Sequence, residues 1–261
     1  MSKHHRIWNA SVYEKYVREG RGSGWSSGYT PWICIQDFAS RGIVSRVKGM
    51  KTGRVHHLMS NNELAYFYIL DWSEIVTDIR EQYPLSDLER AVKIAAQAGI
   101  DYPRDKISGY PYVLTCDFMI TTTDGIKART IKMTPELNNA RTLEKLEIER
   151  RYWAEQGIDW KIVTEREISF QKARNIEWLC TSQGIDASLC EPDEILQGRD
   201  ALLWLLNNTA YSILEATQMV EREYALVSGM GLNLFKQLVL DRKVAINLND
   251  PLNIAAKGIV A

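Results

Sequence analysis

Apolar and polar residues follow two different periods along this chain, and together they predict an ordered series of helices and strands. A period of three to four residues predicts a helix, and a period of two predicts a strand. In the first 167 residues, helices are expected at 12–17, 60–72, 86–98 and 139–156, the last with a solvated charged face. Strands are expected at 32–38, 75–82 and 160–164, and a hairpin at 112–134. This order predicts an α/β fold, a mixed sheet flanked by helices.

The pattern changes to helices alone after residue 167. Helices are expected at 170–182, 191–207, 209–226 and 232–241, followed by one short strand or wing at 243–248. We therefore expect two domains, 1–167 and 168–261, the second mostly α-helical and similar to a winged-helix module.

The hairpin at 112–134 reads YVLTCDFMITTTDGIKARTIKMT and contains the most prominent pair of charged residues. Asp124-Gly125 is a strong signal for a two-residue turn. Counting outward from these two residues places Asp117 opposite Lys132, with Thr130 on the same face. A carboxylate and an ammonium that project together can hold a divalent metal and steady a phosphate. The structural alternative is a cross-strand ion pair of little energetic value.

Glu63 is the second candidate carboxylate. Ser60 and Glu63 have the spacing of a capping box at the start of the helix expected at 60–72. A carboxylate in the first turn of a helix can also reach a metal held by a neighbouring sheet. The sequence leaves both roles open.

The net charge of −1 excludes a strongly basic nucleic-acid-binding protein, but the charge is unevenly distributed. Residues 1–167 contain 24 Lys and Arg against 22 Asp and Glu, and residues 168–261 contain 8 against 11. The segment 38–62 has no acidic residue and no amphipathic period. It is either a solvated basic loop or a surface for DNA phosphates, and its candidate contacts are Arg41, Arg46, Lys48, Lys51 and Arg54.

Other ligand patterns are weak. His56-His57 lacks a third ligand at a suitable spacing, and the four cysteines have no CxxC spacing. We expect free thiols in a reducing cytoplasm. No signal peptide or membrane-spanning apolar run is present in the sequence, so a membrane partner is not expected.

Glu63, Asp117 and Lys132 together resemble the acid, acid and lysine of the restriction-endonuclease-like PD-(D/E)xK fold. A wider set of motifs resembles the TnsA family, the endonuclease subunits of heteromeric cut-and-paste transposases. These motifs are GRGSG…YTPW at 20–32, SRGIVSRVKGMKTGRVHHLMS at 40–60, VTDIREQYPL at 76–85, and WKIVTE at 160–165 followed by Asn175-Ile176.

The resemblance implies roles for individual residues and for two partner proteins. Glu63 and Asp117 would bind Mg²⁺, which Mn²⁺ can replace, with the Ile131 backbone carbonyl as a further ligand and Lys132 as the catalytic lysine. The chain would hydrolyse the 5′ strand at transposon ends, while a TnsB-type RNase H-like transposase processes the 3′ strand. A TnsC-type AAA+ ATPase would contact the domain at 168–261. The protein would be cytoplasmic and would join the nucleoid when it acts.

Position 130 departs from the pattern of that nuclease fold. It holds Thr130, where the fold commonly has an acid or Gln. The site therefore has two side-chain carboxylates, and Mg²⁺ is expected to complete its shell with water and substrate phosphate. Two other functions fit the same residues: a stand-alone restriction-type nuclease, and a catalytically silent DNA-binding scaffold.

Overall fold

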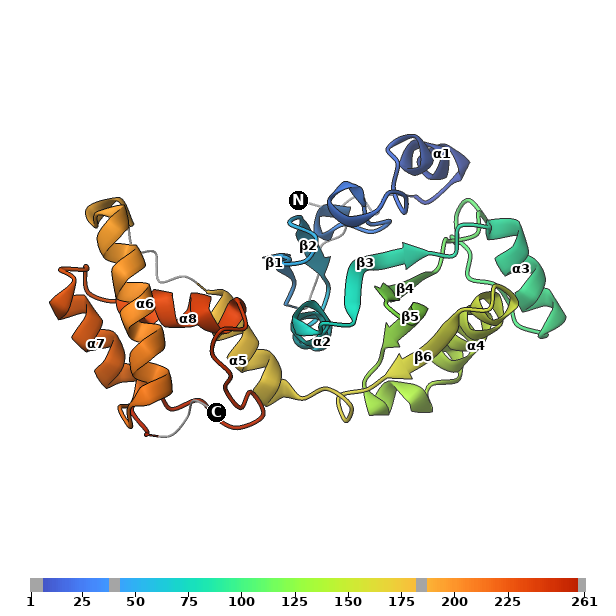
Figure 1. Ribbon diagram of the computed structural model, residues 1–261. Helices are drawn as coiled ribbons and strands as arrows, with labels where there is room; N and C mark the ends of the chain where they lie inside the picture. The colour runs from blue at the N-terminus through green and yellow to red at the C-terminus, as the bar shows by residue number, and fades with distance from the viewer. Residues whose placement is uncertain (1–6, 38–42, 182–186, 258–261) are drawn as a thin grey trace, which may run out of the picture. The chain divides into compact units, whose positions relative to one another are not determined.

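A computed structural model describes residues 7–37, 43–181 and 187–257 of the chain (Figure 1). The chain divides into two compact units, Met1–Ile168 and Ser169–Ala261. Among the described residues, no helix combines the length and the apolar composition needed to cross a membrane.

The first unit is built on a four-stranded sheet. Its strands are β3 (Val76–Pro84), β4 (Thr115–Thr122), β5 (Gly125–Ile131) and β6 (Asp159–Val163), hydrogen-bonded in that order. β3, β4 and β5 are antiparallel neighbours, whereas β6 runs parallel to β5. A parallel pair needs a crossover, and helix α4 (Ala140–Glu155) provides it. The mixed sheet predicted from the sequence is confirmed.

Helices α3 (Leu88–Gln97) and α4 cover one face of this sheet, as Figure 1 shows. Met119 and Ala128 occupy paired positions on β4 and β5 and lie in the core that these helices close. Ile148 and Trp153 of α4 pack into the same core. Burial of these apolar side chains fixes α4 against the sheet, which also fixes the polar residues that α4 carries.

The hairpin turn lies one residue closer to the N-terminus than predicted. Thr122 pairs with Gly125, so the two turn residues are Thr123 and Asp124. The Thr122 hydroxyl accepts from the Asp124 amide and donates to the Gly125 carbonyl, which closes the turn at this point. Gly125 has a φ of 125°, which a residue with a side chain rarely adopts. The register is therefore shifted by two residues, and Asp117 does not pair directly with Lys132.

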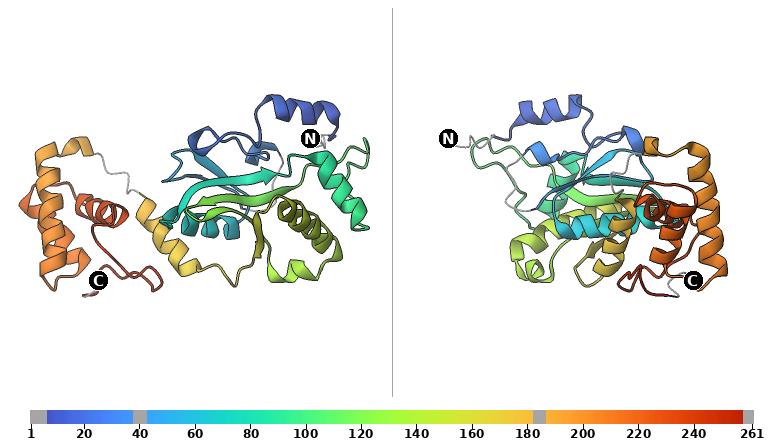
Figure 2. Two further views of the ribbon diagram at one scale, coloured as in Figure 1. Left: turned by 45° about the vertical axis from the view of Figure 1, so that its right-hand side comes forward. Right: turned by 90° about the vertical axis from the view of Figure 1, so that its left-hand side faces the viewer.

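Residues 45–58 of the acid-free segment form a second, two-stranded sheet. β1 (Ser45–Lys48) pairs with β2 (Val55–Leu58), and the hairpin lies on the side of the large sheet opposite α4 (Figure 2). The Asp71 carboxylate of helix α2 (Asn61–Trp72) accepts from the backbone amides of Met50 and Lys51, which anchors the connection between β1 and β2. The alternative of a solvated basic loop is wrong for the residues of β1 and β2. The strands were not predicted because each is too short to show a clear period.

An N-terminal arm lies along β3. It contains helix α1 (Ala10–Arg18) and two short 3₁₀ turns, Ser26–Gly28 and Ile35–Asp37. The second turn occupies part of the segment for which a strand was predicted at 32–38. Gly22 has a φ of 71°, and a Cβ there would lie 2.3 Å from Pro84 Cγ. The arm therefore approaches β3 more closely than a larger residue would allow.

The second unit is helical in its described part. It contains α5 (Phe170–Cys180), a 3₁₀ turn (Ala187–Leu189), α6 (Pro192–Asn208), α7 (Ile213–Glu223) and α8 (Met230–Leu240). A Cβ on Gly231 would lie 2.5 Å from the Thr217 carbonyl, so α7 and α8 cross at close range. No strand forms among the described residues of this unit, and the short strand expected at 243–248 is not present there.

Candidate active site

Asp117 and Lys132 meet at one end of the β4–β5 pair. Lys132 Nζ lies 3.9 Å from Asp117 Oδ2 and donates to the Ile131 carbonyl at 2.8 Å. The Ile131 amide donates to Asp117 Oδ2 at 2.6 Å. Asp117 and Lys132, which the hairpin pattern predicted to lie together, are therefore close to each other although the turn has shifted. A shift of two residues leaves every side chain on its original face of the sheet.

Glu63 lies in the first turn of α2, and Ser60 caps this helix, although the reciprocal bond of the predicted capping box comes from the Met59 amide and not from that of Ser60. Ser60 Oγ accepts from the Glu63 amide and donates to Glu63 Oε1 at 2.9 Å. The Met59 amide donates to Glu63 Oε2 at 2.9 Å. The side chain is buried, with 6% of the residue exposed. These bonds hold the carboxylate in one orientation, directed at the end of β3.

A third residue, Gln82 of β3, joins the two carboxylates. Its Nε2 lies 3.3 Å from Glu63 Oε2 and 3.4 Å from Asp117 Oδ1. Gln82 was not singled out by the sequence analysis, although it lies within the VTDIREQYPL motif. The available signal was its place at the end of the strand expected at 75–82.

The site contains two buried carboxyl groups, Glu63 and Asp117, and both have raised pKa values although Lys132 is close by. Burial, and next the charge of Asp117, raise the pKa of Glu63 to about 8. Burial also raises the pKa of Asp117, although Lys132 and the Ile131 amide act in the opposite direction. Burial alone would lower the pKa of Lys132, but the carboxylates around it, with Asp117 first, raise it. Lys132 is therefore charged at neutral pH.

Glu149 of α4 is the second residue that the sequence analysis missed. It was expected on the solvated face of its helix, but it is buried and 5% exposed. Its Oε2 accepts from the Thr130 hydroxyl at 2.6 Å and from Trp160 Nε1 at 3.4 Å. Burial raises the pKa of Glu149 to about 8, and the charge of Asp117 adds to this shift. Position 130 has no carboxyl group, but the carboxyl group of Glu149 on α4 lies next to it.

The site fits a divalent cation with oxygen ligands. Glu63 and Asp117 are linked through one amide, and their mutual repulsion contributes to the raised pKa of Glu63. A divalent cation would remove this repulsion, and carboxylate and carbonyl oxygens are the ligands that Mg²⁺ prefers. Within the described ranges, no group of three or more His, Cys, Asp or Glu side chains is arranged to hold a metal.

Arg54, one of the predicted phosphate contacts, binds other groups of the protein instead. Its guanidinium is paired with the fully buried Glu81 of β3 and donates to the Ile79 carbonyl at 3.0 Å. Glu81 also binds His56 Nδ1 at 2.7 Å. The side chain of Arg54 is only 8% exposed, so the prediction that it contacts DNA phosphate is not retained.

The other basic candidates are placed differently. Arg46 and Lys48 are exposed on β1, two residues apart, and so project from the same face of the small hairpin. Lys51 is partly buried in the connection between β1 and β2. Arg41 lies outside the described residues. Arg46 and Lys48 are therefore the strongest candidates for a phosphate-facing surface.

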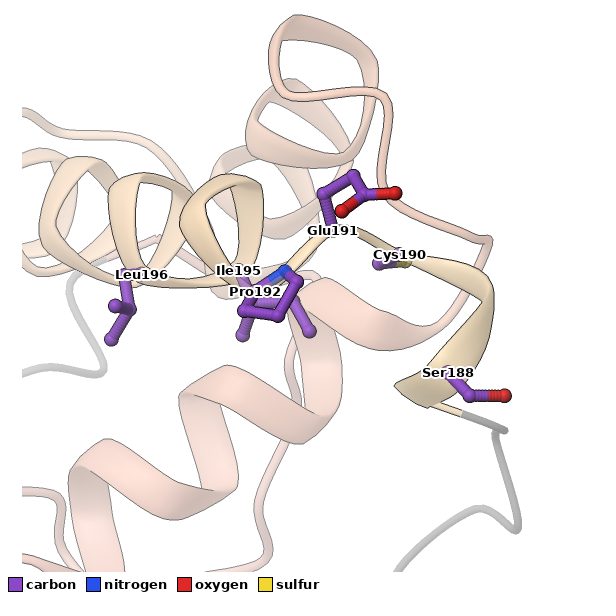
Figure 3. A pocket seen from close by; sticks show the side chains of 6 residues that line it. All are labelled: Ser188, Cys190, Glu191, Pro192, Ile195 and Leu196. Carbon is purple, nitrogen blue, oxygen red and sulfur yellow. The ribbon is translucent and has the colours of Figure 1, made fainter.

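A hollow lies on the surface of the second unit (Figure 3). Six residues line it: Ser188, Cys190, Glu191, Pro192, Ile195 and Leu196. Its lining is mainly apolar and contains one carboxylate, so it has no set of groups for acid–base or metal chemistry. Two strongly exposed apolar residues, Leu189 and Trp204, occur in the same part of the chain.

Comparisons with known proteins find matches for both parts of the chain. Residues 73–165 match the family described as TnsA-like endonuclease N terminal, and residues 167–248 match TnsA endonuclease C terminal. The chain is 35% identical over 252 residues to the transposon Tn7 transposition protein TnsA of Escherichia coli. That alignment covers 95% of this chain and 90% of the relative. Asp117 and Lys132 lie within the first matched segment, and Glu63 precedes it.

Proposed function

Since this chain belongs to the TnsA family of transposon endonucleases, we propose that it hydrolyses the 5′ strand at transposon ends, with Glu63, Asp117 and Lys132 as its catalytic residues. The observation that carries this proposal is that the start of α2, β3, β4 and the end of β5 converge on one point. Gln82 Nε2 lies within 3.4 Å of both carboxylates, and Lys132 Nζ lies 3.9 Å from Asp117.

Glu63, Asp117 and the Ile131 carbonyl would hold the cation, for which we propose Mg²⁺, with Mn²⁺ as a substitute. When bound there, a divalent cation lowers the pKa of water and neutralises charge that develops on the phosphodiester. Lys132 carries a positive charge at the same place, where it can orient the attacking water or stabilise the phosphate in the transition state. The Ile131 amide and Gln82 hold Asp117 in position for both roles. The reaction is direct hydrolysis, without a covalent intermediate between enzyme and DNA.

We further propose two protein partners. A TnsB-type RNase H-like transposase processes the 3′ strand and recognises the end sequence, because the described part of this chain has no base-reading motif. A TnsC-type AAA+ ATPase binds the unit at 169–261. The acidic balance of that unit and the exposed Leu189, Leu196 and Trp204 favour a protein partner over DNA.

The test is a reconstituted transposition reaction with both partners, in which breaks are mapped on each strand. We expect Asp117→Ala to reduce 5′-strand cleavage at least about 100-fold and to leave 3′ joining intact, so that cointegrates accumulate. Lys132→Ala should reduce 5′ cleavage about 10²–10³-fold. Asp124→Ala is the matched control, since Asp124 is exposed in the turn of the same hairpin.

The alternatives predict other results. If Asp117→Ala still cuts both strands, the pair is structural and the chain is a silent scaffold. If the wild-type chain cuts DNA efficiently with Mg²⁺ alone, it is a stand-alone restriction-type nuclease.

A further inference from the structure

Gln82 has an arrangement that a structural residue in a strand would not need. Its amide nitrogen faces Glu63 and Asp117, while its Oε1 accepts from the Thr115 hydroxyl at 3.2 Å. This bond fixes the orientation of the Gln82 amide, with its oxygen toward Thr115 and its NH₂ group toward the two carboxylates. An amide offers two N–H donors, and an ionised carboxylate only accepts. One side chain thus supplies one donor to each of the two carboxylates.

The backbone of Gln82 is also unusual. Its φ is 48°, in the left-handed region, although Gln82 is not a glycine and lies inside a strand. Such a conformation is costly and persists where the surroundings fix it. On both sides the ladder is regular, with Glu81 opposite Phe118 and Tyr83 opposite Cys116. The Trp32 amide of the N-terminal arm donates to the Gln82 carbonyl at 3.3 Å.

These observations have one explanation in common. The regular ladder on either side places Gln82 opposite Asp117 across β3 and β4. The arm and Thr115 then fix the residue from its carbonyl and from its side-chain oxygen. The residue is 4% exposed, so water does not compete freely for its amide.

We propose that Gln82 is a positioning residue of the nuclease centre, which sets the separation of Glu63 and Asp117 so that both bind one divalent cation. The proposal rests on the proposed function, because it assumes that these two carboxylates bind the cation. Gln82 acts through the carboxylates and does not touch the reacting atoms. Groups that orient metal ligands typically contribute 10- to 100-fold to metal affinity or activity.

The first test compares Gln82→Met with the wild-type chain. Met has a similar length and keeps the apolar stem, but it has no N–H donors. We expect the Kd for Mn²⁺, measured from the loss of the free-ion electron paramagnetic resonance signal, to rise at least about 10-fold. The Mg²⁺ concentration for half-maximal 5′ cleavage in the reconstituted reaction should rise by a similar factor. Cleavage at saturating Mg²⁺ should fall much less, because Lys132 and both carboxylates remain.

Thr115 provides a second pair of variants, which decides the question if Gln82→Met does not fold. Thr115→Val removes the hydroxyl that orients the amide and keeps the shape of the side chain. It should raise the Mg²⁺ requirement, whereas Thr115→Ser, which keeps the hydroxyl, should not. A merely structural role would change the melting temperature of these variants without changing their Mg²⁺ requirement.

Asp117→Ala distinguishes failure of the proposed function from failure of the role of Gln82. If Mn²⁺ binding and 5′ cleavage survive this change, the proposed function fails. If both are lost in Asp117→Ala, but Gln82→Met and Thr115→Val keep a Mg²⁺ requirement within about threefold of the wild type, only the role of Gln82 is overturned.

Discussion

Glu149 is a buried acid whose charge state depends on folding. Burial raises its pKa to about 8 in the folded chain, against 4.5 for an ordinary Glu. Between these two pH values the folded chain keeps a proton on Glu149 that the unfolded chain releases. The contribution of Glu149 to stability is therefore fully present below pH 4.5 and is lost as the pH rises toward 8.

Glu149→Gln should remove this pH dependence, because Gln cannot ionise and its Oε1 can still accept from Thr130. We expect the free energy of unfolding of the wild type to decrease between pH 5 and 8, relative to the variant, by an amount on the order of a few kcal/mol. Urea unfolding at several pH values measures this difference. Glu144→Gln on the same helix is the control, since the Glu144 side chain is 41% exposed. Equal pH profiles for wild type and Glu149→Gln would contradict the prediction.

The residues of the site differ in how visible they are in the sequence. Asp117, Lys132 and Glu63 stand out because each interrupts or begins an apolar pattern at a position that geometry can interpret. Glu149 does not stand out, because an acid in an amphipathic helix next to Lys and Arg has the appearance of a solvated residue. Gln82 depends on a left-handed backbone that only tertiary contacts impose. Local pattern thus predicts the primary carboxylates, and the groups around them require the fold.

Among the elements, the β4–β5 hairpin shows why the common face of Asp117, Thr130 and Lys132 was predictable although the turn was not. The prediction placed the turn at Asp124-Gly125, and the chain turns at Thr123-Asp124. Gly125 is the first residue of β5 and adopts a φ of 125°. The Asp-Gly sequence does not show whether its glycine lies in the turn or directly after it. The resulting shift is an even number of residues. Asp117, Thr130 and Lys132 therefore keep their common face, whereas a shift of one residue would have reversed it.

The small β1–β2 hairpin makes a prediction about DNA binding. Arg46 and Lys48 are exposed on one face, and each phosphate contact on duplex DNA contributes about −0.9 to the slope of log K against log salt. Replacing both by Ala should make the slope of DNA binding less steep by up to about 1.8. The control replaces Lys93 and Lys145 by Ala, which removes the same charge from exposed positions on α3 and α4. If both double variants have the wild-type slope, the hairpin does not contact phosphate.

At the scale of the whole molecule, the two units differ in chemistry as well as in fold. The unit at 1–168 contains the sheet, the carboxylates and the exposed basic hairpin. The unit at 169–261 is helical where it is described, has more acidic than basic residues, and exposes large apolar side chains. The shift to helices after residue 167 was visible in the sequence, because helical periods are long enough to be read locally.

This division predicts that a fragment of residues 169–261 folds alone and competes with the full chain for the TnsC-type partner. Circular dichroism should show its helices, and an excess of the fragment should inhibit the reconstituted reaction. Leu196→Asp, at a residue that is 58% exposed, should abolish the inhibition without unfolding the fragment. Gln218→Asp on α7 is the matched control, since it adds the same charge at an exposed position. A folded fragment that does not inhibit at any concentration would refute this role.

The ion pair between Arg54 and Glu81 bears on how long a free subunit stays on DNA. It removes Arg54 from the five residues that were predicted to contact phosphate. Of these five, Arg46 and Lys48 are the ones that the structure shows exposed. Few contacts give weak, salt-sensitive attachment, since non-specific affinity rises with the number of neutralised phosphates. A subunit released from its partners would leave the chromosome quickly. Under the proposed function, brief residence would restrict cutting to places where an assembled complex delivers a transposon end.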